Sequence, residues 1–455
     1  MNPAAIDDLR RQIQGEVVTP ADPQYAKSCM LFNAALHSAP AVIVYCANTT
    51  DVQTVIRWTQ AQSLQLSLRA GGCCVTGFST NTGGVVLDVS RLKQIEIDPK
   101  ARTAVVGPGV KLGDAYGALD PYDLVFPGGE CSMVGMAGLT LGGGVSLVGR
   151  SLGFTVDSLV EAQMVTATGE LVVANDHSHE DLFWALRGGG GSFGTVTELT
   201  VQLSPIAPQV LAGMLIWTID RAAEAMLSCL EYFREEAPRE LDAIFILAAE
   251  PETEDLALML VTTFNGDPST GKAVLDQLEK KTAPTKVQLQ PMPYYEFING
   301  VFHAPRQRVY ELWKSGFVKD PLPLEAAELL VGRFKERPSP DSFVSFELCG
   351  GAMNEVGRSD TAFVHRDQEF LMAILANSSQ EKAGNRAWAR RLYSEITPFL
   401  SGEHYQNYPD VDLDDWQHGY YGENYDRLLE IKSQYDPDDV FRFAQSIGAS
   451  PPRDV

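Results

Sequence analysis

The chain has 455 residues, of which 45% are hydrophobic and 21% charged, and its formal net charge is −23 at pH 7. This composition is that of an ordinary globular protein, and the length predicts two or three domains. The summed negative field repels phosphate backbones and anionic lipid surfaces, and no cluster of Lys and Arg supplies a positive patch. We therefore expect neither nucleic acid nor a membrane among its partners.

The sequence contains no motif for export and none for metal binding. The N-terminal stretch MNPAAIDDLRRQIQ has no apolar core of the kind that a secretory signal requires, and no run of about 18 apolar residues is present. We therefore expect a soluble, cytoplasmic protein. The seven cysteines are irregularly spaced and the seven histidines show no HExxH-like spacing, which predicts neither a disulfide framework nor a metal site.

The hydrophobic pattern changes along the chain. Residues 41–205 alternate short apolar runs with helical stretches and glycine turns, as in AVIVYC, DVQTVIRWTQAQ and LQLSLRA, which is an α/β pattern. From about residue 207 the apolar runs are longer, as in LAGMLIWTI, LDAIFILAAE and FVSFELCGGAM, and helices separate them. This predicts an α+β second domain with a largely antiparallel sheet. A last helix is expected from about Tyr425 to Tyr435, closed by the following DP.

Three glycine-rich segments lie in the first part: RAGGCCVTGFS at 69–79, FPGGECSMVGMAGLTLGGGVS at 126–146 and LRGGGGSFGTV at 186–196. Glycine lets main-chain N–H groups converge on an anion such as a pyrophosphate, although it also marks tight turns. In a Rossmann site such a segment follows the first strand, opens a helix and precedes an acidic residue by about 20 positions. None of the three meets all these conditions, which disfavours a nicotinamide dehydrogenase. No GxSxG elbow indicates a hydrolase.

Taken together, these segments resemble the vanillyl alcohol oxidase (PCMH-type) flavin fold, and within it the berberine bridge enzyme-like branch. The resemblance runs from SAPAVIVYCANTTDVQTVIRWTQAQSLQLSLRAGG through TVDSLVEAQMVTATGELVVAN and DLFWALRGGGGSFGTVTEL to YQNYPD and YYGENYDRLLEIKSQYDPDDVFRFAQSI. It implies an α+β fold in which a two-part FAD-binding domain, residues 1–205 and 405–455, holds an inserted substrate-binding domain, residues 206–404. The inserted domain is expected to have a largely antiparallel sheet.

The resemblance also implies which residues contact FAD. In the family the pyrophosphate lies on the first glycine loop, and the second segment follows the edge of the isoalloxazine ring. The cofactor-binding residues implied here are Arg69, Ala70, Gly71, Gly72, Cys73, Thr76, Gly77, Phe78, Ser79, Gly128, Gly129, Cys131, Val134, Gly135, Gly138, Gly142, Val145, Val196, Tyr421 and Asn424.

Family members often hold the flavin by two bonds, a histidine on the 8α carbon and a cysteine on C6. Cys131 stands at the cysteine position, in GGECSMVG, and is the expected tether. An attacking thiolate requires an electropositive, partly accessible setting. The histidine position carries Cys73, for which three interpretations stay open: a space-filling residue, a thiol that itself bonds the 8α carbon, or a lineage-specific or engineered loss of the histidine.

Two further positions bear on the reaction. Val145 and Leu152 stand where sugar- and alcohol-oxidising members commonly have tyrosines. Because an apolar side chain cannot relay protons, they favour a more hydrophobic substrate. Val134 stands where the family has a small aliphatic residue on the flavin face that meets oxygen, which favours an oxidase, although valine is also a common core residue.

The family's base is often a tyrosine in a YxNY segment, which here runs from Tyr405 to Tyr408. The hypothesis is that Tyr408 is the base and Tyr405 its partner. A phenol has a reference pKa near 10, so Tyr408 requires a hydrogen-bond donor or a positive field to ionise near neutral pH. Tyrosines spaced by three are also common packing residues. Aromatic candidates for the substrate pocket, some of them expected in the core, are Tyr294, Tyr295, Phe297 and Phe302.

The leading functional hypothesis is an FAD-dependent oxidase of a hydrophobic or polycyclic natural product, acting at an alcohol or through oxidative ring closure. Hydride passes from the small-molecule substrate to flavin N5, and dioxygen is the final acceptor. Two alternatives stay open. The flavin shapes the pocket of a pericyclase-like cyclase in which redox chemistry is lost, or the protein is a non-catalytic flavin-binding remnant.

Overall fold

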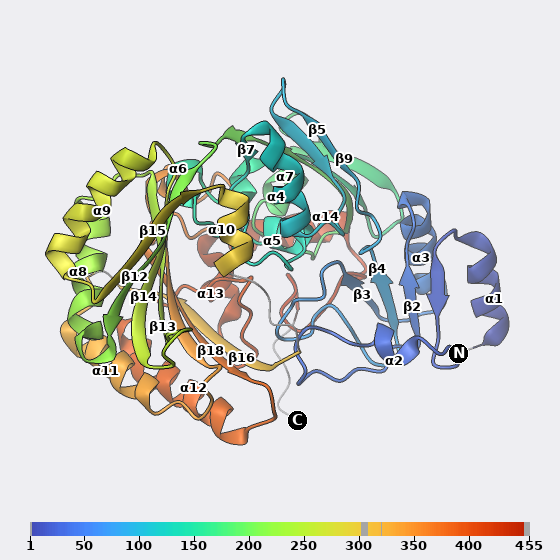
Figure 1. Ribbon diagram of the computed structural model, residues 1–455. Helices are drawn as coiled ribbons and strands as arrows, with labels where there is room; N and C mark the ends of the chain where they lie inside the picture. The colour runs from blue at the N-terminus through green and yellow to red at the C-terminus, as the bar shows by residue number, and fades with distance from the viewer. Residues whose placement is uncertain (1, 302–307, 320, 450–455) are drawn as a thin grey trace.

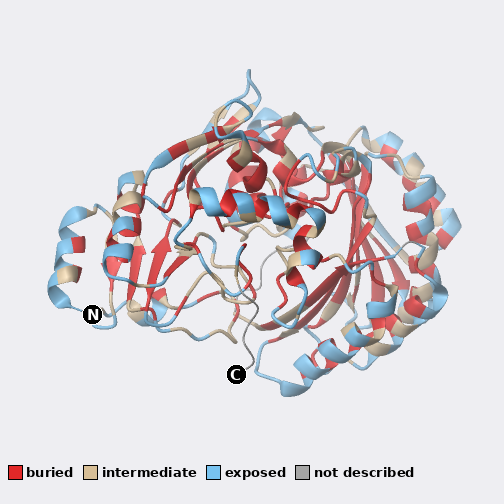
Figure 2. Cartoon of the chain, turned by 180° about the vertical axis from the view of Figure 1, so that it is seen from behind, coloured by how far each residue is buried: buried red, intermediate tan, exposed pale blue. Residues whose placement is uncertain are grey.

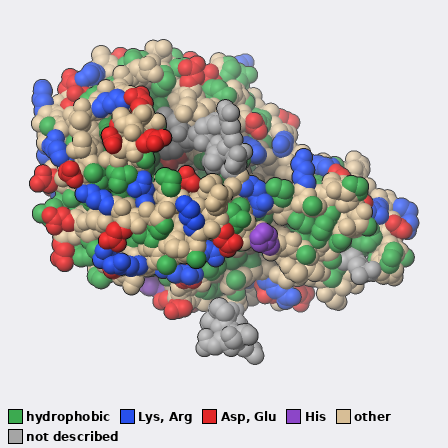
Figure 3. Space-filling view, turned by 60° about the horizontal axis from the view of Figure 1, so that its bottom comes forward, with side chains coloured by type: hydrophobic (Ala, Val, Ile, Leu, Met, Phe, Trp, Pro, Cys, Tyr) green, Lys and Arg blue, Asp and Glu red, His purple; other side chains and the backbone are tan. Residues whose placement is uncertain are grey.

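The computed structural model describes residues 2–301, 308–319 and 321–449. A sheet near the N-terminus lies at one end of the molecule, a second sheet lies beside it, and a large sheet with its helices forms the other end (Figure 1). On the face seen in Figure 3, acidic and basic side chains are interspersed rather than gathered by sign. Among the described residues, no helix is both long and apolar enough to span a bilayer.

The first sheet has the order β1–β2–β4–β3, with β2, β4 and β3 parallel. Its strands are β1 (Glu16–Val18), β2 (Val42–Tyr45), β3 (Leu66–Arg69) and β4 (Val85–Asp88). The apolar runs VIVY and VVLD are almost wholly buried, as is typical of parallel strands covered on both faces. Helix α3 (Thr49–Ala61) connects β2 to β3 and begins where the Asn48 side chain accepts a hydrogen bond from the Asp51 N–H.

The second sheet has the order β5–β6–β10–β8–β9 and is antiparallel. Its strands are β5 (Ile95–Asp98), β6 (Thr103–Val106), β8 (Leu159–Val165), β9 (Leu171–Asn175) and β10 (Thr195–Gln202). The α/β pattern predicted for residues 41–205 therefore holds for the first sheet only. Short turns join β5 to β6 and β8 to β9, and such turns connect antiparallel strands.

Short helices and a two-stranded ribbon complete this half of the chain. They are α1 (Pro3–Gln12), α2 (Tyr25–Ser28), α4 (Leu112–Leu119), α5 (Met136–Leu141), α6 (Gly149–Leu152), α7 (Glu180–Leu186), β7 (Leu124–Val125) and β11 (Ser204–Pro205). Helix α4 precedes the second glycine segment, α5 lies within it, and α7 leads into the third.

The large sheet has seven strands in the order β15–β12–β14–β13–β17–β18–β16, all antiparallel. Its strands are β12 (Val210–Thr218), β13 (Leu241–Ala249), β14 (Leu256–Phe264), β15 (Lys286–Met292), β16 (Tyr310–Phe317), β17 (Phe343–Leu348) and β18 (Phe370–Ser378). The predicted antiparallel sheet is thus confirmed. Figure 2 shows most of its strands buried.

Four helices cover the outer face of the large sheet (Figure 1). They are α8 (Ala222–Glu235), α9 (Pro268–Thr282), α11 (Leu324–Lys335) and α12 (Ala383–Ile396), while α10 (Tyr294–Val301) packs against α4. Leucine and phenylalanine side chains from both layers form one buried cluster. The opposite face of the sheet is turned toward the second glycine segment, since Phe317 and Leu371 on that face pack with Val145.

The C-terminal segment returns to the first half of the chain. Helix α13 (Trp416–Tyr421) leads into α14 (Tyr425–Tyr435), so the predicted helix has the expected bounds. The Lys432 ammonium is buried and donates to the Ser192 carbonyl at 2.8 Å and the Asp436 carboxylate at 2.5 Å. The hydrogen bond to Ser192 holds α14 against the third glycine segment.

The loop before α13 is held to edge strand β16 by a buried ion pair. Lys314 Nζ lies 2.7 and 2.9 Å from the two Asp410 carboxylate oxygens, and the Lys314 side chain is 2% exposed. Asp412 contacts the same ammonium at 2.5 Å.

We expect Asp410→Asn to lower the free energy of unfolding by roughly 3 kcal/mol, because it leaves a buried ammonium with one carboxylate fewer. Urea denaturation measures the change. The exposed Asp414 provides the control, since Asp414→Asn should change the unfolding free energy by less than about 0.5 kcal/mol. Equal effects of the two substitutions would contradict this account.

Candidate flavin site

The first and second glycine segments meet backbone to backbone. A Cβ added to Gly71 would lie 2.8 Å from the Gly135 nitrogen, and one added to Gly135 would lie 2.9 Å from the Gly71 nitrogen and Cα. Real Cβ atoms do not approach so closely, so both positions require glycine. The contact brings the loops that carry Cys73 and Cys131 together.

The two cysteines sit in this junction. Both are partly exposed, and Cys73 Sγ lies 3.5 Å from the Gly71 carbonyl and 3.7 Å from the Met133 carbonyl. Burial and the nearby Cys131 thiol raise the pKa of Cys73 to about 11. Burial also raises the pKa of Cys131, although hydrogen bonds from the backbone N–H groups of Met133 and Val134 partly offset this effect. The setting is therefore accessible but not electropositive, contrary to what an attacking thiolate requires.

The first glycine loop has main-chain groups available to bind a ligand, but no free positively charged side chain at Arg69. The Arg69 guanidinium is buried against Asp88 at 2.5 Å and donates to the Ser28 carbonyl at 2.9 Å, so it is occupied within the fold. Gly72 and Gly77 have φ of +69° and +80°, which favours glycine. The Ser79 hydroxyl is buried without a hydrogen-bond partner.

Three glycines of the second and third segments have open space beside them. A Cβ added to Gly138, Gly190 or Gly191 would meet no atom within 4 Å. These glycines belong to the second and third segments, where the main chain is open to a flavin and its phosphates, and the unpaired Ser79 hydroxyl belongs to the first segment. The residues present thus fit FAD. In the described part of the chain, no group of three His, Cys, Asp or Glu residues is placed to hold a metal ion.

The other predicted cofactor contacts have neighbours within the protein. Phe78 stacks on Phe443 with ring centroids 5.0 Å apart, and a Cβ on Gly142 would meet the Asn407 amide. The Asn424 amide donates to the carbonyls of Arg358 and Thr361. The remaining positions are buried or partly buried in the same region: Ala70, Thr76, Gly128, Gly129, Val134, Val145, Val196 and Tyr421. Their contact with FAD stays a prediction.

Tyr405 and Tyr408 lie together but have different hydrogen-bond partners. Their ring centroids are 5.1 Å apart at 74°. The Tyr405 hydroxyl accepts hydrogen bonds from the Gly144 N–H at 2.6 Å and from the Asn407 amide at 3.0 Å. The Tyr408 hydroxyl donates to Glu347 Oε1 at 2.5 Å. Tyr408 is thus hydrogen-bonded to Glu347 on β17 and contacts Tyr405 through its ring, and the catalytic roles of the two tyrosines stay predictions.

This pairing changes which group can act as a base. Burial and the negative charge of Glu347 raise the pKa of Tyr408 well above its ordinary value, and burial raises that of Tyr405 as well. Burial raises the pKa of Glu347 to about 7, although the hydrogen bond from Tyr408 opposes the shift. Near neutral pH, the carboxylate is therefore the proton acceptor of the pair, and the phenol is its proton-carrying neighbour.

The inner face of the large sheet forms the wall opposite the second glycine segment. Cross-strand register places Ile216, Met259, Ile246, Ser345, Ala373 and Ser315 in one row. The next row contains Ile244, Glu347, Leu371 and Phe317. Trp313 from the same face packs edge-on against Tyr408, with centroids 5.0 Å apart. Most side chains of these rows are apolar, and Glu347 is the acidic residue that lies beside Tyr408.

Sequence reasoning missed the acidic residues of the site. Glu347 and Glu311 lie within strands, and Glu130 precedes Cys131 directly. Burial and the charge of Glu347 raise the pKa of Glu130 well above its ordinary value. Period-two alternation in FVSFEL does place Glu347 on one strand face with Ser345. The sequence does not show, however, that Tyr408 packs against that face.

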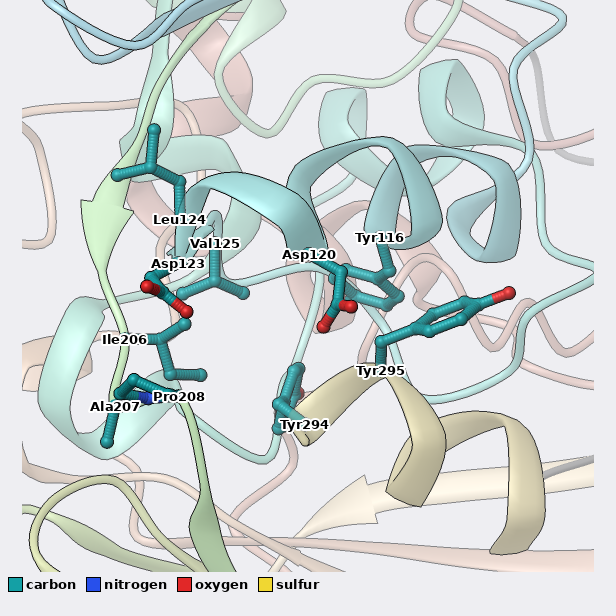
Figure 4. A pocket seen from close by; sticks show the side chains of 10 residues that line it. All are labelled: Tyr116, Asp120, Asp123, Leu124, Val125, Ile206, Ala207, Pro208, Tyr294 and Tyr295. Carbon is teal, nitrogen blue, oxygen red and sulfur yellow. The ribbon is translucent and has the colours of Figure 1, made fainter. Parts of the chain in front are cut away.

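The aromatic candidates from α10 lie mostly in the core. Tyr294 and Phe297 are buried, and Phe302 lies outside the described residues. Tyr294 and Tyr295 line a small cavity of about 20 Å³, together with Tyr116 and Asp120 from the chain opposite (Figure 4). Neither Cys131 nor Tyr408 lines this cavity.

Comparison with known proteins identifies the family. Residues 40–175 match the FAD binding domain family, and residues 404–448 match the family described as berberine and berberine like. An uncharacterized FAD-linked oxidoreductase of Bacillus subtilis, YgaK, is 32% identical over 447 residues, covering 96% of this chain and 98% of the relative. The chain belongs to the berberine bridge enzyme-like family of FAD-linked oxidoreductases.

Other relatives agree with this assignment. Tetrahydroberberine oxidase of Berberis wilsoniae is 27% identical, covering 93% of this chain and 91% of the relative. The solved structure of Physcomitrella patens BBE-like 1 has a TM-score of 0.90 at 25% identity, covering 97% of this chain and 98% of that one. The predicted family, the α+β fold class and an FAD-dependent oxidoreductase are thereby confirmed for this berberine bridge enzyme-like protein.

We expect Gly135→Ala to reduce the FAD content of the purified protein severalfold and to lower the free energy of unfolding by about 1–3 kcal/mol, because the added methyl group presses on the Gly71 backbone. Flavin absorbance per protein and thermal unfolding measure the two effects. Gly332→Ala in α11 is the control, since its Cβ would meet no atom within 4 Å. An unchanged FAD content in Gly135→Ala would show that the contact is dispensable.

Proposed function

We propose that this protein is an oxidase of a hydrophobic or polycyclic natural product and that Cys131 tethers its FAD. The observation that carries the proposal is the 2.5 Å hydrogen bond from Tyr408 to Glu347, on the sheet face turned toward the second glycine segment. FAD, when bound, accepts a hydride at N5 and passes the electrons to dioxygen, which becomes hydrogen peroxide.

The proposed role of Glu347 is to take the proton that the substrate hydroxyl loses. Tyr408 transfers its own proton to Glu347 while it receives the proton of the substrate, so the phenol stays neutral throughout. This suits the raised pKa of Tyr408, which disfavours a phenolate intermediate. Tyr405, fixed by the Gly144 N–H and the Asn407 amide, positions the Tyr408 ring.

The apolar surroundings support a hydrophobic substrate. Around the two tyrosines lie Val145, Phe154, Phe317, Phe363 and Leu371, all buried. The far end of the sheet face carries the apolar side chains of Met214, Ile216, Ile246 and Met259. Such walls exclude water and bury ligand surface without specific polar contacts. The relative named tetrahydroberberine oxidase is consistent with a substrate of this kind.

We expect the catalytic rate to fall at least about 100-fold in Glu347→Gln and at least tenfold in Tyr408→Phe, because each removes a member of the proton path. Oxygen uptake with a turned-over substrate measures the rate, and retained flavin absorbance shows an intact site. Turnover of Tyr408→Phe within a factor of two of the parent would eliminate the assignment of Tyr408.

The pH dependence follows from the raised pKa of Glu347. The base acts as a carboxylate, so kcat/KM should be low below about pH 7, rise through that value and level off above it. Glu347→Gln should lose the rise. A wild-type profile that is flat from pH 5 to pH 9 would contradict the role of Glu347 as the base.

The redox character is tested by mixing enzyme and substrate without oxygen. We expect the flavin absorbance near 450 nm to bleach and to return, with hydrogen peroxide, when air is admitted. Product formed without bleaching or oxygen uptake would refute the oxidase and favour the cyclase. Acid precipitation followed by peptide mass analysis shows whether FAD is attached at Cys131, Cys73, both or neither.

A further inference from the structure

A buried carboxyl group belongs to a strand that is held against the first glycine loop. Glu311 stands at the beginning of edge strand β16, is 6% exposed, and its Oε2 atom has no hydrogen-bond partner. Buried carboxyl oxygens are nearly always paired, so an unpaired one indicates a functional role.

A second residue holds Glu311 against the first glycine loop. The buried Asn33 amide donates to the Val75 carbonyl at 2.7 Å and to the Glu311 carbonyl at 3.1 Å, and its oxygen accepts from the Glu311 N–H at 3.1 Å. Val75 is two residues beyond Cys73. The backbone of Glu311 is thereby fixed relative to the loop that carries this thiol.

The side chain of Glu311 lies on the sheet face that meets the candidate site. Alternation along β16 places it with Trp313, which packs against Tyr408. Its negative charge disfavours ionisation of both Cys73 and Cys131, which places the carboxylate within electrostatic reach of the two thiols. Because both thiols are protonated near neutral pH, either of them must lose a proton before or as it forms a bond to carbon.

We propose that Glu311 accepts the thiol proton when Cys131 bonds to the flavin ring, a role that rests on the proposed tether. The S–H proton passes to Glu311 as the S–C bond forms, and the displaced ring hydrogen leaves as a second proton. The two electrons released remain on the ring until dioxygen removes them, and dioxygen takes up two protons to become hydrogen peroxide.

The rate of attachment should depend on pH through Glu311 itself. Burial raises the pKa of Glu311 to about 8, opposed by the Trp313 indole. A base must be ionised, so attachment should accelerate as pH rises through about 8. The other groups that act on the thiols are Lys111, which favours the thiolate of Cys73, and Glu130, which disfavours that of Cys131.

The test compares attachment rates in variants. Protein produced under riboflavin limitation is given FAD in air at pH 8.5, and FAD bound to the Cys131 peptide is followed by acid precipitation and mass analysis. We expect attachment to be at least tenfold slower in Glu311→Gln, with no rise near pH 8. Glu198→Gln is the control, because burial also raises the pKa of this carboxyl on β10 while its charge does not act on either thiol, so the attachment rate should be unchanged.

Alkylation of the FAD-free protein by iodoacetamide shows whether slow attachment results from the lost proton acceptor or from reduced access to the Cys131 thiol. Removing the negative charge should leave alkylation of Cys131 as fast or faster in Glu311→Gln, although attachment slows. Slower alkylation in parallel with slower attachment would reveal a packing defect and overturn the assignment.

Glu311→Asp keeps a carboxylate and should attach FAD faster than Glu311→Gln. Equal rates in Glu311→Asp and Glu311→Gln, or a wild-type rate in Glu311→Gln, would overturn the role of Glu311 and leave the tether intact. A wild-type protein that attaches no FAD at Cys131 would refute the tether, and the role of Glu311 with it.

Discussion

The backbone contact between Gly71 and Gly135 is the constraint on which the candidate site depends. Two loops from distant parts of the sequence meet there without side chains between them. The contact places Cys73 Sγ within 3.7 Å of the Met133 carbonyl, in the turn that also holds Cys131. A larger residue at either glycine would separate the loops, and the candidate flavin site would open with them.

The segment from Tyr405 to Asp410 then relates this site to the large sheet. One end is bound to the second glycine segment through the Gly144 N–H, and the other to β16 through Lys314. Between them, Tyr408 donates to Glu347. Because the segment is held at both ends, the Tyr408–Glu347 pair lies at a defined position relative to the second glycine segment, which the proposed proton transfer requires.

Burial, more than charge pairing, determines the acid–base character of the site. Glu130, Glu311 and Glu347 all have raised pKa values with burial as the main cause, and both thiols are raised in the same way. With pKa values of about 8 and about 7, Glu311 and Glu347 can exchange protons near neutral pH, whereas burial favours the protonated form of the thiols and phenols of the same region. The chemistry we propose therefore relies on carboxylates as bases.

The sequence by itself determined the features that depend on local pattern. The bounds of α14, the antiparallel large sheet and the family all follow from ordered motifs and from apolar periodicity. The α/β pattern predicted for residues 41–205 was wrong for the second sheet, because apolar runs alone do not fix strand direction. The domain boundaries at 205 and 404 stay a prediction.

Only the tertiary structure decided which acidic residues belong to the site. Tyr408 and Glu347 are 61 positions apart, and Glu311 reaches the cysteine loops through Asn33, 278 positions away. No spacing in the sequence links such residues, since their proximity results from strand register and from the return of the C-terminal segment. Their pKa shifts also depend on burial by distant parts of the chain, so they arise only when the chain is folded.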